Sequence, residues 1–159
     1  MIWRLSHRAD PVARRLADLH YNRQHVGAPQ FVPPGRCLVL VSDGAFWVTS
    51  WQFGEYVKHR WPDAWVCSAF RRESGPVASE MIRDAVAATV WKWGDVPTLG
   101  MVTFVNRDKV ARKRDPGRCF RRAGFLDDGE TEGGLVALRL PAESMPLPEM
   151  PIGANLALA

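Results

Sequence analysis

Residues 64–105, AWVCSAFRRESGPVASEMIRDAVAATVWKWGDVPTLGMVTFV, form the stretch that decides the fold class. The β-rich run Ala64–Arg71 predicts a strand, and Glu73–Pro76 predicts the turn that follows it. Apolar residues at helical spacing then predict a helix that ends at Gly94, and Leu99–Val105 is typical of a strand buried on both faces. A strand, a helix and a second buried strand in this order are typical of an α/β chain.

The sequence on either side of this stretch predicts further elements. Ser79 is the expected N-cap of the central helix, and Asp43-Gly44 is the pair expected to form a type I′ turn. The expected fold is therefore α/β (α+β), with helices flanking a mixed central sheet. The further elements are a strand at Ile2–Leu5, a helix from Asp10-Pro11 to about His25, a hairpin over residues 37–51, a short helix that Asp115-Pro116 caps and Gly124 closes, and a strand at Gly134–Leu140.

Composition excludes several classes of protein. The chain has 159 residues, of which 47% are hydrophobic and 24% charged, so a collagen-like or wholly disordered chain is excluded. No apolar run approaches the roughly 20 residues of a membrane span, and MIWRLSHRAD lacks the apolar core of a signal peptide. Cys37, Cys67 and Cys119 are far apart and odd in number, which indicates reduced thiols. We expect a cytoplasmic protein with no membrane partner.

The only break in composition comes after Leu140. Residues 1–140 are expected to form one domain, and residues 141–159, PAESMPLPEMPIGANLALA, are a Pro-rich tail. We expect this tail to be extended, or docked on the domain or on a second copy of the chain in a homodimer.

Positive charge is concentrated in one segment of a chain whose formal net charge is +4. Residues 107–122 read RDKVARKRDPGRCFRR. Such a segment is a solvated loop and helix face, a track for nucleic-acid phosphates or a site for an anionic cofactor. If it binds DNA, the side chains expected to hold the backbone are Lys109, Arg112, Lys113, Arg114 and Arg118.

A second basic region, residues 53–63, mixes aromatic and positively charged side chains. Lys58, Arg60 and Trp61 are its candidates for nucleic-acid binding, because an aromatic ring beside a basic rim can stack on an extruded base. The alternative is that these aromatic side chains belong to the core.

Two motifs resemble the GNAT superfamily of N-acetyltransferases over roughly residues 2–140. The first is the loop Arg72-Glu73-Ser74-Gly75-Pro76-Val77, and the second is Asn106 followed by Phe120-Arg121-Arg122-Ala123-Gly124-Phe125. The resemblance implies that Arg72, Gly75 and Ser79 hold the pyrophosphate of acetyl-CoA at a helix start. Glu73, Pro76 and Val77 depart from the family loop, and Phe120 replaces the tyrosine that often protonates the departing thiolate.

The chain further resembles the Mom-type phage DNA-modification proteins, which share the GNAT fold. The segments that carry this resemblance are His20-Tyr21, Phe70-Arg71, Ser79, residues 103–106 (TFVN) and the stretch from Gly117 to Phe125. It implies conversion of adenine in DNA to its N6-carbamoylmethyl form, which shields the DNA from restriction nucleases. If a phage encodes the chain, its location is the cytoplasm of the host cell. The implied catalytic residues are His20, Tyr21, Arg71, Ser79 and Asn106.

Each of these residues also has a structural interpretation. His20 either caps a helix end or orients the base and accepts a proton, and Tyr21 can stack on a base or donate a hydrogen bond. Arg71 either pairs with Glu73 or Glu80 or clamps an anion in bidentate fashion. Ser79 is either an N-cap or a group in the cleft, and Asn106 either caps the strand or pairs with the adenine edge.

The sequence leaves cofactors and two alternative functions open. His20, His25 and His59 show no metal-ligand spacing, so no metal site is predicted, and iron stays open because the adenine chemistry is unusual. The donor of the transferred group is unknown, and acetyl-CoA is disfavoured by the altered loop. The alternatives are an acetyl-CoA-dependent N-acetyltransferase and a non-enzymatic DNA-binding or host-interaction protein on the same scaffold.

Overall fold

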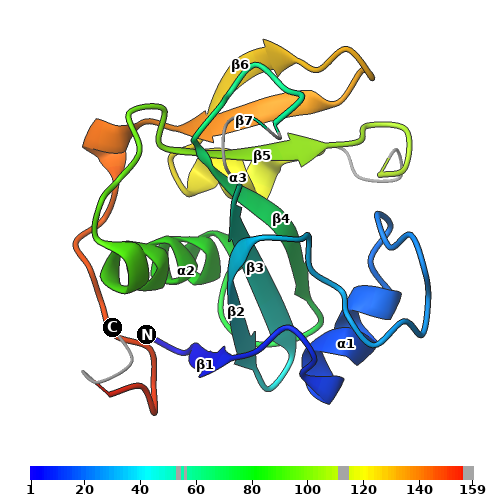
Figure 1. The fold of residues 1–159 in the computed structure, drawn as a ribbon, viewed down its shortest axis with the longest axis vertical. Helices are drawn as coiled ribbons and strands as arrows, with labels where there is room; N and C mark the ends of the chain where they lie inside the picture. The colour runs from blue at the N-terminus through cyan, green and yellow to red at the C-terminus, as the bar shows by residue number, and fades with distance from the viewer. Residues whose placement is uncertain (53–54, 56, 111–114, 156–159) are drawn as a thin grey trace.

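The computed structural model describes residues 1–52, 55, 57–110 and 115–155 (Figure 1). Over these residues seven strands form one mixed sheet in the order β1-β2-β3-β4-β5-β7-β6, with helices on its faces. This confirms the expected mixed α/β architecture. The elements are β1 Arg4–Ser6, α1 Pro11–Asp18, β2 Arg36–Ser42, β3 Ala45–Trp51, β4 Trp65–Arg72, α2 Ala78–Trp93, β5 Met101–Val105, α3 Arg118–Arg122, β6 Leu126–Glu130, β7 Val136–Leu140 and a 3₁₀ turn at Ala142–Ser144.

The pairing of β4 with β5 is short, and the two strands then separate. They are parallel, and their last paired residues are Cys67 and Thr103. Beyond this point β4 stays paired with β3 as far as Arg72, while β5 stays paired with β7 as far as Val105. Figure 1 shows the two halves of the sheet diverging at this place. The carboxyl ends of β4 and β5 therefore leave a gap in the sheet, the kind of place where open α/β sheets bind ligands.

A β-bulge at Ser68 sets which side chains of β4 face this gap. The register with β3 pairs Val48 with Ala69 but Thr49 with Cys67, so Ser68 is the extra residue. Because a bulge shifts the side-chain alternation by one position, Cys67 and Phe70 lie on the same face of the sheet.

The two faces of the sheet have separate cores. On one face α2 covers a cluster that contains Trp3, Trp47 and Trp65, all fully buried. On the other face Leu16 of α1 packs with Phe46 and the neighbouring strand residues. Burial of each such side chain contributes about 1.5–3 kcal/mol, so the sheet is held from both sides.

Helix α1 is shorter than the sequence suggests. Asp10 caps it as expected by accepting from the backbone N–H of Val12 and Ala13, but the helix ends at Asp18 rather than near His25. The Asp18 carboxylate accepts hydrogen bonds from Arg23 and from the Gly27 N–H, which draws the chain back after the helix. The buried face is Ala13, Leu16 and Ala17, while Val12 and Leu19 are exposed.

Three local expectations were wrong. Ser79 lies inside α2, whose N-cap is Val77 without a side-chain hydrogen bond. Gly117, in the left-handed region at φ 85°, precedes α3 in place of an Asp115 cap. Gly44 does not have the positive φ of a type I′ turn. It is required instead because a Cβ there would lie 1.8 Å from the Ser74 Oγ.

Strand β6 was not predicted, because its sequence LDDGE is mostly exposed and lies at the edge of the sheet. The C-terminal tail docks on the domain. Glu149 N–H donates to the Ala87 carbonyl, Ile152 N–H donates to the Trp3 carbonyl, and Ile152 bridges to Arg4 beside β1. None of the described helices is long and apolar enough to cross a membrane.

Candidate functional site

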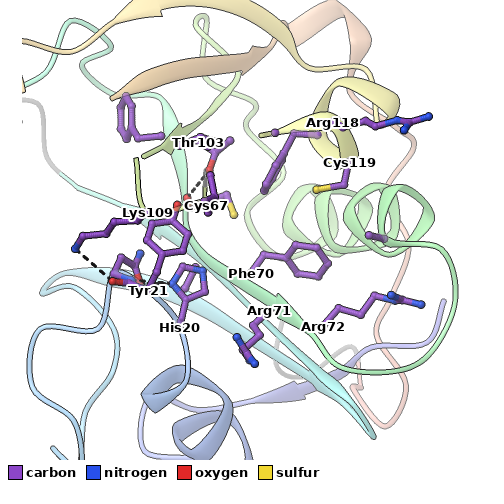
Figure 2. Close-up of a pocket in the computed structure, with 18 of the residues that line it drawn as sticks. His20, Tyr21, Cys67, Phe70, Arg71, Arg72, Thr103, Lys109, Arg118 and Cys119 are labelled. Atoms are coloured by element: carbon purple, nitrogen blue, oxygen red, sulfur yellow. Dashed lines mark hydrogen bonds between the residues drawn. The ribbon is translucent and has the colours of Figure 1, made fainter. Parts of the chain in front are cut away.

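A cavity of 1110 Å³ opens where β4 and β5 separate (Figure 2). Five parts of the chain line it: the segment after α1, strands β4 and β5, the start of α2, and the loop and helix α3 that follow β5. Ligand pockets are commonly about 300–1,000 Å³, so this one is as large as the largest common ligand sites. The predicted site residues that line it are His20, Tyr21, Arg71, Arg72, Ser79, Lys109 and Arg118.

Two further predicted residues do not line the cavity, and three cannot be placed. Asn106 and Gly75 are outside the lining of the cavity, although both are next to segments that line it. Arg112, Lys113 and Arg114 fall outside the described residues. Asn106 accepts hydrogen bonds from the N–H groups of Asp108 and Lys109 through its side-chain oxygen. It therefore ends β5 by organising the next turn, which is the structural role considered for it.

The His20–Tyr21 segment lies at the mouth of the cavity. The two rings stack with centroids 4.6 Å apart, and the Lys109 ammonium donates to the Tyr21 carbonyl at 3.4 Å. Burial raises the pKa of the Tyr21 phenol above its ordinary value, although a hydrogen bond with the Asn106 backbone opposes the rise. The phenol is therefore a neutral hydrogen-bonding group at physiological pH.

Arg71 joins the same segment to β4. Its Nη1 donates to the Leu19 carbonyl at 2.9 Å, at the end of α1, and its Nη2 lies 3.8 Å from the Glu73 carboxylate. Its buried Nε has no hydrogen-bond partner within the described structure. Arg15 also pairs with Glu73, at 3.1 Å. Glu73 is thus paired with two arginines and lies outside the cavity lining. Its negative charge therefore does not oppose an anion in the cavity.

The start of α2 opens into the cavity beside Arg72. The Arg72 guanidinium donates to the carbonyls of Gly75 and Pro76 at 2.9 and 2.7 Å. These hydrogen bonds fix the conformation of the loop between β4 and α2. The N–H groups of Glu73 and Ser74 donate to the Gly44 carbonyl and are not available to a phosphate. Val77, Ala78 and Ser79, at the start of the helix, line the cavity, and the first N–H groups of a helix can receive an anion. The residues fit a small anionic group better than a full pyrophosphate cradle.

Phe120 has a structural role in the floor of the cavity. It is 8% exposed and packs against Trp47, Phe70 and Phe125. With no hydroxyl at this position, the proton donor expected from the acetyltransferase pattern is missing. Cys119 and Ser79, the side chains that the sequence offers as substitutes for this donor, both line the cavity.

Cys67 lies at the point where the strands separate. Burial raises the pKa of its thiol far above the ordinary value, so the thiol is neutral at physiological pH. Its backbone carbonyl accepts a hydrogen bond from the Thr103 hydroxyl at 3.1 Å, which ties β4 to β5 immediately before the gap. Cys67 therefore acts as packing and not as a nucleophile.

The second basic region belongs to another part of the molecule. Trp61 is 4% exposed and its indole N–H donates to Asp128 at 2.7 Å, so the interpretation as a stacking platform is corrected to a core residue. Arg60 lies over the Trp61 ring, 5.2 Å from its centroid, and donates to the Glu130 carbonyl. Lys58 is exposed beside them and does not line the cavity.

Among the described residues, no group of three or more His, Cys, Asp or Glu side chains is placed to hold a metal ion. Comparisons with family models, curated proteins and solved structures found no match to this chain. The function of this chain is therefore inferred from the residues of the cavity.

Proposed function

We propose that this chain is a transferase that modifies the exocyclic N6 amine of adenine in DNA, on a GNAT-like scaffold similar to that of the Mom-type proteins. The observation that carries the proposal is the convergence of His20, Tyr21, Arg71 and Ser79 on one cavity. These residues come from three different elements or loops, and they are four of the five catalytic residues that the resemblance to the Mom-type family implies; the fifth, Asn106, does not line the cavity. Titratable and hydrogen-bonding side chains that converge on one cavity are typical of a reaction site.

The size and charge of the cavity support a nucleic-acid substrate. A base must leave the duplex before its amine can reach a recessed site, and the cavity volume leaves room for a base together with a donor. Tyr21 and His20 supply ring faces for stacking, and cationic side chains surround them. The cationic residues of the lining are Arg71, Arg72, Lys109, Arg118 and Arg122, against the acidic Asp108 and Asp115.

The proposed reaction is a displacement at a carbon atom of an activated donor. The N6 nitrogen forms a bond to the carbon of the carbamoylmethyl group, and the bond from that carbon to the leaving group breaks. The leaving group keeps the electron pair, and the amine loses one proton to a base of the protein. His20 is the base in this proposal, because an imidazole accepts protons near neutral pH.

The test is to express the chain in a bacterium, digest its DNA to nucleosides and weigh them. We expect a heavier deoxyadenosine that disappears in His20→Gln. His25→Gln is the matched control, because His25 is exposed in the loop after α1 and is not part of the cavity. An unaltered set of nucleosides from the wild-type protein would contradict the proposal.

One observation favours a second candidate, an acetyl-CoA-dependent N-acetyltransferase. The uncapped start of α2 beside Arg72 presents N–H groups to the cavity, as an anionic cofactor requires. Calorimetric titration with acetyl-CoA separates the two candidates. Saturable binding together with unaltered nucleosides would favour the second. Neither binding nor altered nucleosides would leave a non-enzymatic DNA-binding protein.

A further inference from the structure

Asn22 was not among the residues that the sequence singled out, yet its side chain connects His20 to the central sheet. Its amide touches the His20 ring on one side and the Ser68 backbone on the other. It also lines the cavity, next to the two residues of the proposed site.

The orientation of the Asn22 amide follows from its partner on β4. The Ser68 carbonyl oxygen lies 3.0 Å from the amide Nδ2, and a carbonyl can only accept a hydrogen bond. The reverse orientation would place two acceptor oxygens at that distance. The NH₂ group therefore faces Ser68, and the amide oxygen Oδ1 faces His20.

This orientation decides which nitrogen of His20 carries hydrogen. The Nδ1 atom of the ring is in close contact with the Asn22 Oδ1, and an amide oxygen can only accept. The Asn22 backbone N–H also points to this atom, 3.3 Å away, and a hydrogen bond there would need a lone pair on Nδ1. Because 3.3 Å is longer than the usual 2.9–3.0 Å, we take the closer contact with Oδ1 to decide the tautomer and place the hydrogen on Nδ1. In the neutral ring the lone pair is then on Nε2.

We propose that Asn22 is a positioning residue that holds His20 in the Nδ1–H tautomer, so that Nε2 takes the proton released by the acceptor amine. The role in proton transfer rests on the proposed function, whereas the tautomer does not. In the step, the amine nitrogen forms its bond to the donor carbon, the leaving group departs with its electron pair, and the amine proton moves to Nε2. Asn22 itself neither gains nor loses a proton.

Hydrogen bonds to β4 and to the loop after β5 hold the segment that contains His20 and Asn22 in place. The bulge at Ser68 belongs to β4, which is paired with β3, so the carbonyl that orients Asn22 is part of the sheet. On either side of His20, Arg71 holds the Leu19 carbonyl and Lys109 holds the Tyr21 carbonyl. The backbone that carries the ring is thus anchored to β4 and to the loop after β5.

The first experiment reads the tautomer directly and needs no substrate. In protein labelled with ¹⁵N at histidine, the chemical shifts of the two ring nitrogens show which one carries hydrogen, and His20→Gln identifies the His20 signals. In the neutral ring we expect Nδ1 protonated and Nε2 unprotonated in the wild type, and also in Asn22→Asp, whose carboxylate still accepts from Nδ1–H although it loses the donor to the Ser68 carbonyl. In Asn22→Leu the Nε2–H tautomer should rise. A wild-type His20 protonated at Nε2, or an unchanged tautomer in Asn22→Leu, would overturn the inference.

The second experiment measures turnover on a DNA substrate. We expect kcat of Asn22→Leu to fall about 10²-fold, at the lower end of what a general base contributes, with KM nearly unchanged. Asn22→Asp should recover part of the loss, because it keeps the acceptor for Nδ1–H and loses the donor to the Ser68 carbonyl. Gln24→Leu, a change at an exposed residue two positions further on, is the control for loss of a polar side chain. Full activity in Asn22→Leu would refute the positioning role. A wild type that modifies no DNA but shows the expected tautomer would sink the proposed function and leave the orientation of His20 standing.

Discussion

Two histidine–aromatic pairs of this chain look alike in sequence and differ in the structure. His20 and Tyr21 stack at the mouth of the cavity, where the ring nitrogen of His20 meets the Asn22 amide. His59 packs against Phe104 and Trp61 beneath the second basic region, 5.1 and 6.1 Å between ring centroids. Both pairs have basic neighbours, so charge and aromatic content do not separate them.

The difference lies in what satisfies the polar atoms. The Trp61 indole N–H is bonded to Asp128, and the pKa of that carboxyl is held below its ordinary value by this bond and by Arg139. The His59 Nδ1 accepts from the Trp61 backbone N–H at 3.1 Å. The polar atoms of this pair are thus used inside the fold. His20 and Tyr21 also have partners, the Asn22 amide and the Asn106 backbone, but both residues line the cavity. A buried, satisfied pair stabilises, and a pair at a cavity wall is placed to meet a ligand.

The first test asks whether His20 and His59 contribute equally to activity. We expect His20→Gln to lower the rate of DNA modification by about 10²–10⁴-fold, the usual contribution of a general base, because Nε2 is lost as proton acceptor. His59→Gln should stay within a few-fold of the wild-type rate, since His59 packs behind the lining residue Phe104 and does not itself line the cavity. The measurement is modified deoxyadenosine per unit time on a DNA substrate. Equal losses in the two variants would remove the distinction.

The reverse test measures stability. Trp61→Ala should lower the free energy of unfolding by about 3–5 kcal/mol, the cost of deleting a large buried aromatic side chain. Tyr21→Ala should cost only about 1 kcal/mol, because Tyr21 is partly exposed at the cavity. Urea unfolding followed by tryptophan fluorescence and circular dichroism gives both values. A larger loss for Tyr21→Ala than for Trp61→Ala would reverse the roles proposed for the two pairs.

The pH dependence of stability sharpens the comparison further. Burial lowers the pKa of His59, so below about pH 6.5, its ordinary value, the unfolded chain binds more protons than the folded one. The stability that His59 contributes is therefore fully present above that pH and falls as the pH drops toward the lowered pKa. We expect the free energy of unfolding to decrease between pH 7.5 and 5.5, and to decrease less in His59→Gln. An identical slope in the two proteins would show that His59 titrates equally in both states.

The smallest expected effect concerns the surface of the buried pair. Arg60 lies over the Trp61 ring and is otherwise exposed, so Arg60→Ala should cost about 0.5–1 kcal/mol of stability. Its effect on DNA affinity should be smaller than that of Lys109→Ala, because Lys109 is at the cavity. Urea unfolding and a salt titration of DNA binding measure the two quantities. If Arg60→Ala reduces the slope of log affinity against log salt as much as Lys109→Ala does, the second basic region also contacts phosphates.

Local patterns predicted most of the secondary structure. The hairpin of β2 and β3, the Asp10 cap of α1, strand β4, the end of α2 at Gly94 and strand β5 were all confirmed. The missed or misplaced features depend on non-local contacts. Strand β6 exists because its polar residues pair with β7, and α1 ends early because Asp18 is bonded to Arg23 and Gly27.

The candidate site was predictable only in part. The resemblance to the Mom-type proteins pointed to five catalytic residues, of which His20, Tyr21, Arg71 and Ser79 line the cavity and Asn106 does not. Asn22 was missed because a single Asn has no spacing pattern. Trp61 was misassigned as a stacking residue because the Asp128 that satisfies its N–H lies 67 positions away.

By itself the sequence determined the order of strands and helices apart from β6, since turn residues, caps and hydrophobic spacing act over a few neighbouring positions. Only the tertiary structure decided where the cavity lies. The separation of β4 from β5 after Cys67 and Thr103 depends on each strand following a different partner, and those partners are distant in the chain. The bulge at Ser68, and with it the orientation of Asn22 and His20, is likewise a product of strand register, which no local pattern of side chains specifies.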